Sequence, residues 1–169
     1  TSIDHAESTY TVSVATSKGS KSYLISGNSA PQLLGENSLS RLAANVALAT
    51  SKPISFTARD GLQIHGYLTL PEGTDGKNLP MVLYVHGGPW ARDRWGNDGQ
   101  GKVSQMMANR GYAVLQVNYR GSSGYGRAFQ DKAIGEFAGK MHDDLIDGVN
   151  WADKNGVADP AKVAIYGRS

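Results

Sequence analysis

Apolar and β-branched residues alternate with polar ones near the start of the chain. Residues 10–16 follow this period of two, residues 17–20 are typical of a turn, and residues 21–26 resume the extended pattern. Two such runs joined by a short turn predict a β-hairpin. One hairpin cannot bury a hydrophobic core by itself, so we expect residues 1–50 to be the end of a larger β domain whose remainder is missing.

The pattern after this hairpin is weaker. Residues 28–35 are polar and are expected to form a loop. Residues 38–49 have apolar positions at mixed spacing, which fits either a short helix or an irregular link.

From Pro53 onward, short apolar runs alternate with helix-length segments. Glycine follows both clear helical patterns, at Gly111 and Gly156, as it often does at helix ends. Strands separated by helices indicate βαβ units, so residues 51–169 are predicted to form an α/β fold with a parallel sheet. The predicted strands are residues 54–58, 62–70, 81–85, 112–119 and 162–166, the helices are residues 101–110 and 143–155, and residues 129–140 are ambiguous.

The strand at residues 81–85 is an unbroken apolar run, as expected of a strand buried on both faces, and it ends in His86-Gly87-Gly88-Pro89. Adjacent glycines leave backbone N–H groups bare, and such a group can hold a developing oxyanion. We therefore interpret Gly88 as the N–H donor and Gly87 as the residue that allows the turn. The alternative is a tight loop that binds nothing.

A second apolar run, residues 163–166, is followed by Gly167-Arg168-Ser169. This is the first half of a Gly-x-Ser-x-Gly nucleophile elbow, in which a strand turns sharply into a helix and exposes the serine. The motif is weak alone, because an ordinary serine can occupy such a turn. Together with the upstream glycine loop, it favours Ser169 as a nucleophile, since one mechanism requires both features.

Histidine is the usual base for such a serine, but His86 is not interpreted as that base. In α/β-hydrolases the chain order is nucleophile, acid, histidine, so the base lies downstream of Ser169. All four histidines, His5, His65, His86 and His142, precede it. We expect His86 to shape the oxyanion loop by hydrogen bonding, with a purely structural histidine as the alternative.

A glycine-rich loop at residues 121–126 follows the strand at residues 112–119. Its spacing is not that of a dinucleotide motif, and no phosphate-binding Gly-Lys-Ser/Thr follows, so no cofactor is predicted. Arg120 or Tyr125 could lie near substrate. The favoured alternative is a structural turn in which Arg120 forms an internal ion pair.

Several other polar and aromatic residues have an ordinary explanation. The acids near residue 143 could suggest a metal, but a solvated helix start explains them better, so no metal is predicted. The arginines after the oxyanion loop could bind a carboxylate, or they could be exposed and flexible. The tryptophans there are expected to pack against the protein rather than to bind a ligand. These residues are His142, Asp143, Asp144, Asp147, Arg92, Arg94, Trp90 and Trp95.

Composition limits the classes of function. A hydrophobic share of 40% and a charged share of 19% indicate a soluble globular protein. A net charge of +2 without a dense basic cluster argues against a nucleic-acid partner, and the absence of cysteine excludes disulfides and a cysteine nucleophile. No apolar run is long enough to span a membrane. The chain begins at Thr1, so the compartment is open: cytoplasmic, or periplasmic or secreted if a leader has been removed.

Three motifs in order resemble the prolyl oligopeptidase family of serine peptidases, nearest to its acylaminoacyl-peptidase and dipeptidyl-peptidase-like branch. They are Tyr-Val-His-Gly-Gly-Pro-Trp-Ala-Arg-Asp at 84–93, Asn-Tyr-Arg-Gly-Ser-Ser-Gly-Tyr-Gly at 118–126 and Ala-Asp-Pro-Ala-Lys-Val-Ala-Ile-Tyr-Gly-Arg-Ser at 158–169. The resemblance covers about residues 54–169.

The resemblance implies an α/β-hydrolase domain, of which residues 51–169 are the N-terminal portion, behind a β-propeller that restricts access to short peptides. Residues 1–50 then resemble the last propeller strands and a link. Ser169 would be the nucleophile and Gly88 an oxyanion donor. The usual continuation after the serine, the triad acid and the triad histidine are absent, so these 169 residues are expected to be inactive alone.

Two other functions stay open at this point. One is an esterase or lipase on the same fold, although Pro89 stands where glycine-rich lipases usually carry another glycine. The other is a scaffold or binding protein without catalysis. Cleavage preference and oligomeric state do not follow from the sequence.

Overall fold

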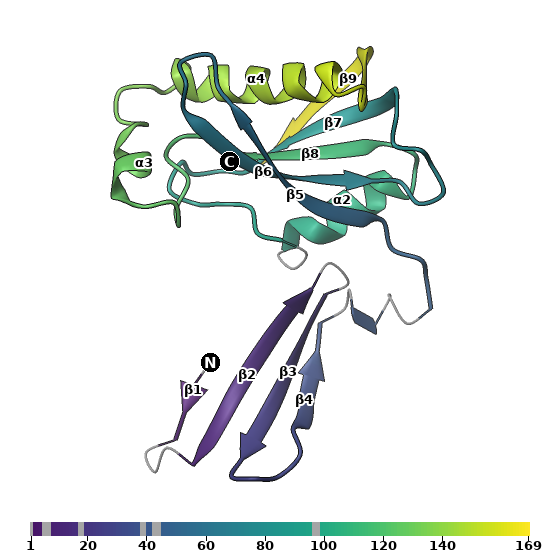
Figure 1. Cartoon of the computed structure of the whole chain (residues 1–169), viewed down its shortest axis with the longest axis vertical. Coiled ribbons are helices and arrows are strands. Elements are labelled where there is room, and N and C mark those ends of the chain that lie inside the picture. Colours follow the sequence, from purple (N-terminus) through teal and green to yellow (C-terminus); the bar gives the residue numbers. More distant parts are fainter. Residues whose placement is uncertain (1, 5–7, 17–18, 38–39, 42–44, 96–98) are drawn as a thin grey trace.

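The computed structural model describes residues 1–169 except for residues 1, 5–7, 17–18, 38–39, 42–44 and 96–98. Two β-sheets make up most of it, and Figure 1 shows the smaller one lying apart from an α/β unit. The change of pattern near residue 50 corresponds to the passage from one sheet to the other, because the α/β unit begins with a strand at Thr50.

The small sheet is antiparallel, with the order β1-β2-β3-β4. The predicted hairpin is confirmed: β2 and β3 pair from Thr9 with Ser26 to Thr16 with Gly19. Its central turn, residues 17–18, lies outside the described residues. The strands are β1 (Ser2–Ile3), β2 (Thr9–Thr16), β3 (Gly19–Ser26) and β4 (Gln32–Glu36).

The predicted loop at residues 28–35 is wrong, because β4 (Gln32–Glu36) pairs with β3. Exposed Leu33 and Leu34 interrupt any alternation, and Leu34 is an extra residue opposite the step from Ser22 to Tyr23, so the strand leaves no period-two signal. Of residues 38–49, the described part contains a short helical turn at Ser40 and Arg41 and then an irregular link.

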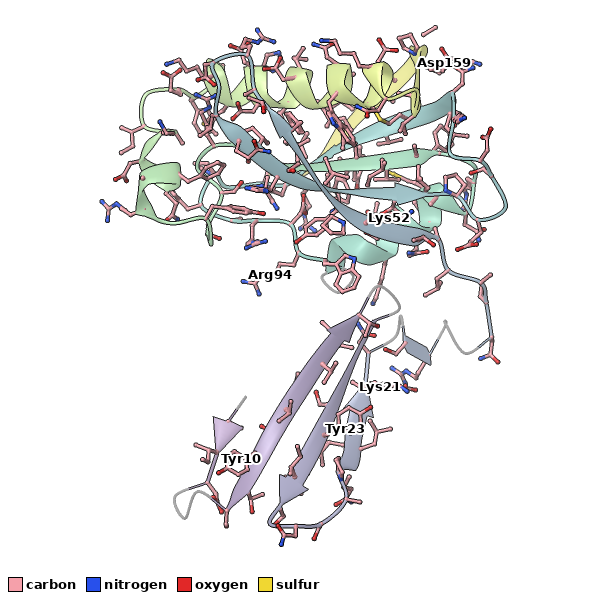
Figure 2. The ribbon with its side chains drawn as sticks, viewed as in Figure 1. Tyr10, Lys21, Tyr23, Lys52, Arg94 and Asp159 are labelled. Carbon is pink, nitrogen blue, oxygen red and sulfur yellow. The ribbon has the colours of Figure 1, made fainter. Side chains whose placement is uncertain are left out.

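The small sheet has no hydrophobic core in its described residues. Apolar side chains project from it into solvent, as Figure 2 shows for Tyr10, and Val14 and Leu33 are about half exposed. Such a sheet needs another layer against one of its faces to be stable.

The α/β unit has a five-stranded sheet of order β5-β6-β8-β7-β9. β7 lies parallel to both β8 and β9, as the βαβ pattern predicted, and β6 lies antiparallel to β5 and β8. The strands are β5 (Thr50–Thr57), β6 (Gln63–Leu70), β7 (Leu79–Val85), β8 (Ala113–Asn118) and β9 (Ala158–Gly167).

Helices cover the two faces of this sheet. Figure 1 shows α4 (Lys140–Lys154) along one face and α2 (Gly99–Ala108) on the other. Gly111 and Gly156 have left-handed φ angles of 89° and 70°, which lets the chain turn back after each helix. The ambiguous segment contains a short helix, α3 (Arg127–Asp131), followed by turns.

The core is centred on β8, in which all six residues are buried. Apolar side chains of β6, β7 and α4 pack around it. Burial on both faces explains why β7 contains an unbroken apolar run and why β8 is mostly apolar, with Gln116 and Asn118 as buried polar exceptions. Of the helices in the described part of the chain, none is long and apolar enough to cross a membrane.

Candidate active site

The oxyanion-loop motif and the candidate nucleophile lie next to each other at the carboxyl ends of two neighbouring strands. β7 and β9 are parallel neighbours, and Val85 pairs with Gly167. The residues that follow each strand therefore emerge side by side, which brings the loop at His86 against Ser169.

Ser169 has a φ of 76°, in the left-handed region that is costly for a residue with a Cβ. A nucleophile elbow requires such a strained turn at the end of a strand, because it lifts the hydroxyl out of the backbone. The positive φ of Ser169 is compatible with such a turn, and the assignment of Ser169 as the nucleophile stays a prediction.

Gly87 leaves the space that this turn occupies. A Cβ built on Gly87 would lie 2.7 Å from the Cβ of Ser169, 2.8 Å from the carbonyl oxygen of Arg168 and 3.1 Å from the Ser169 Oγ. Any side chain here would collide with the elbow. The structure thus gives a different reason for this glycine: close approach of Ser169, rather than the turn itself, excludes a side chain.

The turn belongs to Gly88, whose φ is 140°. A Cβ on Gly88 would lie 2.9 Å from the backbone nitrogen of Trp90 and 3.0 Å from that of Ala91. The chain is tightly folded at this point, and only glycine fits without strain.

His86 is buried, and its imidazole is not directed at Ser169. Nδ1 lies 2.8 Å from the Gly87 carbonyl oxygen, and Nε2 lies 3.0 Å from the Ser122 Oγ. The ring stacks on Tyr119, with centroids 4.5 Å apart and an interplanar angle of 13°. These contacts tie the imidazole to the loop and to the end of β8.

Tyr119 and Ser122 are parts of this arrangement that the sequence did not single out. The Tyr119 hydroxyl donates to the His86 carbonyl oxygen at 2.8 Å, and the Ser122 hydroxyl donates to the Tyr119 carbonyl oxygen at 2.7 Å. Burial, and then the charge of Asp93, raise the pKa of Tyr119 to about 12, so its hydroxyl keeps its hydrogen. In the sequence, Tyr119 and Ser122 come just after the mostly apolar strand at residues 113–118, and this position was the available signal.

Arg120 forms the internal ion pair that the favoured interpretation of this loop predicted. It donates to Asp144 through Nε at 2.9 Å and through its terminal nitrogen at 2.7 Å, and to Asp60 at 2.8 and 3.1 Å. The hydrogen bond from Arg120 lowers the pKa of Asp60 to about 2. The cluster joins the β5–β6 turn, the loop after β8 and α4.

The acids of α4 are not a solvated helix start, which corrects the sequence interpretation. Asp144 is fully buried under Arg120. Asp143 and Asp147 each lie 2.8 Å from a nitrogen of Arg59. The acids face the β5–β6 hairpin because that hairpin carries the complementary arginine, and no metal-binding group of acids and histidines occurs within the described residues.

Tyr125 lies in a polar and aromatic cluster that also contains Arg92. The Tyr125 hydroxyl accepts from Asn118 at 2.8 Å and from Arg92 at 3.1 Å, and the Arg92 guanidinium lies 4.6 Å from the centre of the Tyr125 ring. His65 stacks on the same ring at 5.0 Å. Arg92 is therefore part of a packed cluster rather than a freely exposed arginine.

The tryptophans and Arg94 after the oxyanion loop lie at the surface. Trp90 is 66% exposed and Trp95 is 42% exposed, so neither side chain is packed in the interior, and their expected role in packing rather than binding stays a prediction. The Trp95 indole donates to the Ser51 carbonyl oxygen at 2.9 Å. Arg94 projects at the edge of the α/β unit (Figure 2).

Comparison with known proteins agrees with this geometry. Residues 99–169 match the model of the prolyl oligopeptidase family. Dipeptidyl aminopeptidase BIII from Pseudoxanthomonas mexicana is 52% identical over 124 residues, which is 69% of this chain and 18% of that protein. Dipeptidyl peptidase family member 6 from Caenorhabditis elegans is 38% identical over 135 residues, 68% of this chain and 18% of that protein. The chain thus spans about a fifth of the length of these curated relatives.

Solved structures give the same result. A puromycin-hydrolyzing peptidase from Mycobacterium tuberculosis superposes with a TM-score of 0.79 at 27% identity, over 96% of this chain and 25% of that one. An acylaminoacyl peptidase from Pyrococcus horikoshii does so with a TM-score of 0.74 at 23% identity, over 95% of this chain and 25% of that one. These matches confirm the family resemblance and the predicted fold class, an α/β-hydrolase portion preceded by propeller strands.

Proposed function

We propose, from the relationship of this chain to the prolyl oligopeptidase family, that the complete protein is a serine peptidase that hydrolyses short peptides. The observation that carries this proposal is the approach of Gly87 to Ser169, because the oxyanion loop and the strained serine turn are built into each other. Relatives named as dipeptidyl peptidases support the peptide substrate.

In the proposed reaction, the Ser169 Oγ attacks the carbonyl carbon of the scissile bond and its proton passes to a histidine. The negative charge on the substrate oxygen is held by the N–H of Gly88 and by the N–H of the residue after Ser169. The leaving amine takes the proton, and water then hydrolyses the acyl-enzyme. The triad acid and histidine would come from residues outside the 169 described by this sequence.

The supporting residues have separate roles in this proposal. Gly87 keeps space for the elbow, and His86 holds the loop through its contacts with Gly87 and Ser122. Arg120 fixes the loop after β8 through Asp144 and Asp60, and Tyr125, which bonds to Asn118 at the end of β8, is assigned to the wall of the site. No metal or cofactor is required.

The small sheet has a proposed role as well. We assign residues 1–50 to the end of a β-propeller-like domain and its link, and residues 51–169 to the catalytic unit. The exposed apolar side chains of the small sheet fit this assignment, because neighbouring propeller strands would cover them. A propeller in front of the site would restrict access to short peptides.

The test uses the protein at its full natural length. Ser169→Ala should abolish labelling by a fluorophosphonate and lower peptide hydrolysis by about 10³-fold or more. Ser55→Ala, at an exposed position of the edge strand β5, is the matched control and should keep both. Hydrolysis of simple esters but of no peptide would instead indicate an esterase, and an unlabelled, inactive wild type would indicate a non-catalytic protein.

A further inference from the structure

Resting on the proposed function, we propose that Tyr119 is a positioning residue that, together with His86 and Ser122, sets the orientation of the peptide groups of the oxyanion loop. Within this set, the hydroxyl of Tyr119 acts on the backbone of His86, and the imidazole of His86 acts on the backbone of Gly87. None of these three side chains has to touch the substrate.

The argument begins with the planarity of the peptide bond. In a trans peptide the C=O and the following N–H point in opposite directions, so fixing the carbonyl also fixes the N–H. The Gly87 carbonyl oxygen lies 2.8 Å from His86 Nδ1, which turns the N–H of Gly88 away from the imidazole. The His86 carbonyl oxygen accepts from the Tyr119 hydroxyl at 2.8 Å, which turns the N–H of Gly87 away from Tyr119.

The hydrogen bond with the Gly87 carbonyl oxygen requires a hydrogen on Nδ1 of His86. A carbonyl oxygen only accepts, so Nδ1 must be protonated to donate to Gly87. Nε2 faces the hydroxyl of Ser122, and that hydroxyl also reaches the Tyr119 carbonyl oxygen. Stacking on Tyr119 holds the plane of the ring.

The peptide groups of Gly87 and Gly88 need these hydrogen bonds from neighbouring side chains. Gly87 and Gly88 have no side chains to pack, so nothing of their own prevents either peptide from rotating. An oxyanion donor contributes to catalysis only if it points at the charge before that charge develops. The contacts with His86, Tyr119 and Ser122 hold the peptide groups in one orientation, and all three of those residues are at least 94% buried.

The first experiment measures Tyr119→Phe in the full-length protein, because this change removes only the hydroxyl and leaves the stacked ring. We expect kcat to fall about tenfold at nearly unchanged KM, and the affinity for a peptide boronate, which mimics the tetrahedral intermediate, to fall in parallel. Tyr112→Phe is the matched control, at an exposed position just before the other end of β8, and should leave all three quantities unchanged. Ser122→Ala should give a smaller change of the same kind, and it provides the test if Tyr119→Phe does not fold.

If Tyr119 has only a structural role, Tyr119→Phe will lower the melting temperature but leave kcat and the boronate affinity equal to those of the wild type. That result would overturn the proposal.

Crystal structures of the wild-type and Tyr119→Phe proteins separate this proposal from the proposed function. If the wild type hydrolyses nothing, the function fails, while a rotated His86–Gly87 peptide in the variant still supports positioning, because the Tyr119 hydroxyl bonds to the carbonyl oxygen of that peptide. An unrotated peptide together with unchanged kinetics refutes it.

Discussion

Gly87 and Ser169 lie so close that a methyl group on Gly87 would stand 2.7 Å from the Cβ of Ser169. Real side-chain carbons do not approach one another to that distance, so one of the two segments would have to move. Since Gly87 belongs to the loop after β7 and Ser169 to the turn after β9, any movement changes the distance between the proposed nucleophile and the proposed oxyanion donor.

We therefore predict that Gly87→Ala lowers the rate of fluorophosphonate labelling and of peptide hydrolysis by about 100-fold in the full-length protein. The matched control is Gly35→Ala in β4, because a Cβ there meets nothing within 4 Å. Labelling kinetics and circular dichroism check the two variants. A Gly87→Ala protein that reacts at the wild-type rate would contradict the close packing of loop and elbow.

Asp144→Asn should destabilise the protein strongly, because it leaves the buried Arg120 guanidinium without its buried counter-charge. Breaking a buried pair from one side costs about 3–5 kcal/mol. The control is Asp131→Asn, whose partner Arg127 is 86% exposed, and its cost should be about 0–1 kcal/mol. Urea unfolding of both variants measures the difference, and equal costs would argue against a buried pair.

The pKa of Asp60, lowered from 3.8 to about 2 by Arg120, predicts a pH dependence. A carboxylate with a lowered pKa in the folded state stabilises the protein above its ordinary pKa, and this stabilisation disappears as the pH falls through the folded value. The free-energy difference between wild type and Asp60→Asn should therefore shrink as the pH is lowered from about 5 to about 2. Chemical unfolding across this range tests the prediction, and a difference independent of pH would refute it.

Gln105 fastens the link before β5 to α2. Its side-chain amide donates to the Ala49 carbonyl oxygen at 2.9 Å and accepts from the Ala49 N–H at 2.8 Å. Gln105→Ala should accelerate protease cleavage near Ala49 with little change in the melting temperature, because the link opens locally. Lys102→Ala, on the exposed side of the same helix, should cleave at the wild-type rate. Limited proteolysis followed by mass spectrometry distinguishes the two.

Local pattern was enough to predict the strands that carry the site. β7 and β8 are buried on both faces and therefore are mostly apolar, and the motif that indicates a turn at Ser169 is confined to three residues. Elements that depend on distant partners were not predictable. β4 pairs with β3 in a register that shifts at Leu34, and Asp144 is buried because it pairs with Arg120, which lies 24 residues away in sequence and adjacent in space.

The contacts of His86 were unpredictable for the same reason. Tyr119 and Ser122 reach it because β8 lies next to β7 in the sheet order. Sequence gives the strands in chain order but does not say which become neighbours. The residues that hold the oxyanion loop could be recognised only after that order was known.

The pairing of Val85 with Gly167 also determines where the chain tolerates inserted or deleted residues. One residue added within residues 163–167, the part of β9 that pairs in unbroken register with β7, would advance Ser169 by about 3.3 Å and turn its side chain to the other face of the sheet. The same residue added between α3 and α4 would leave the ladder untouched. We therefore expect insertions and deletions among natural variants to accumulate in residues 132–139, and the spacing from Val163 to Ser169 to be constant wherever the serine is retained.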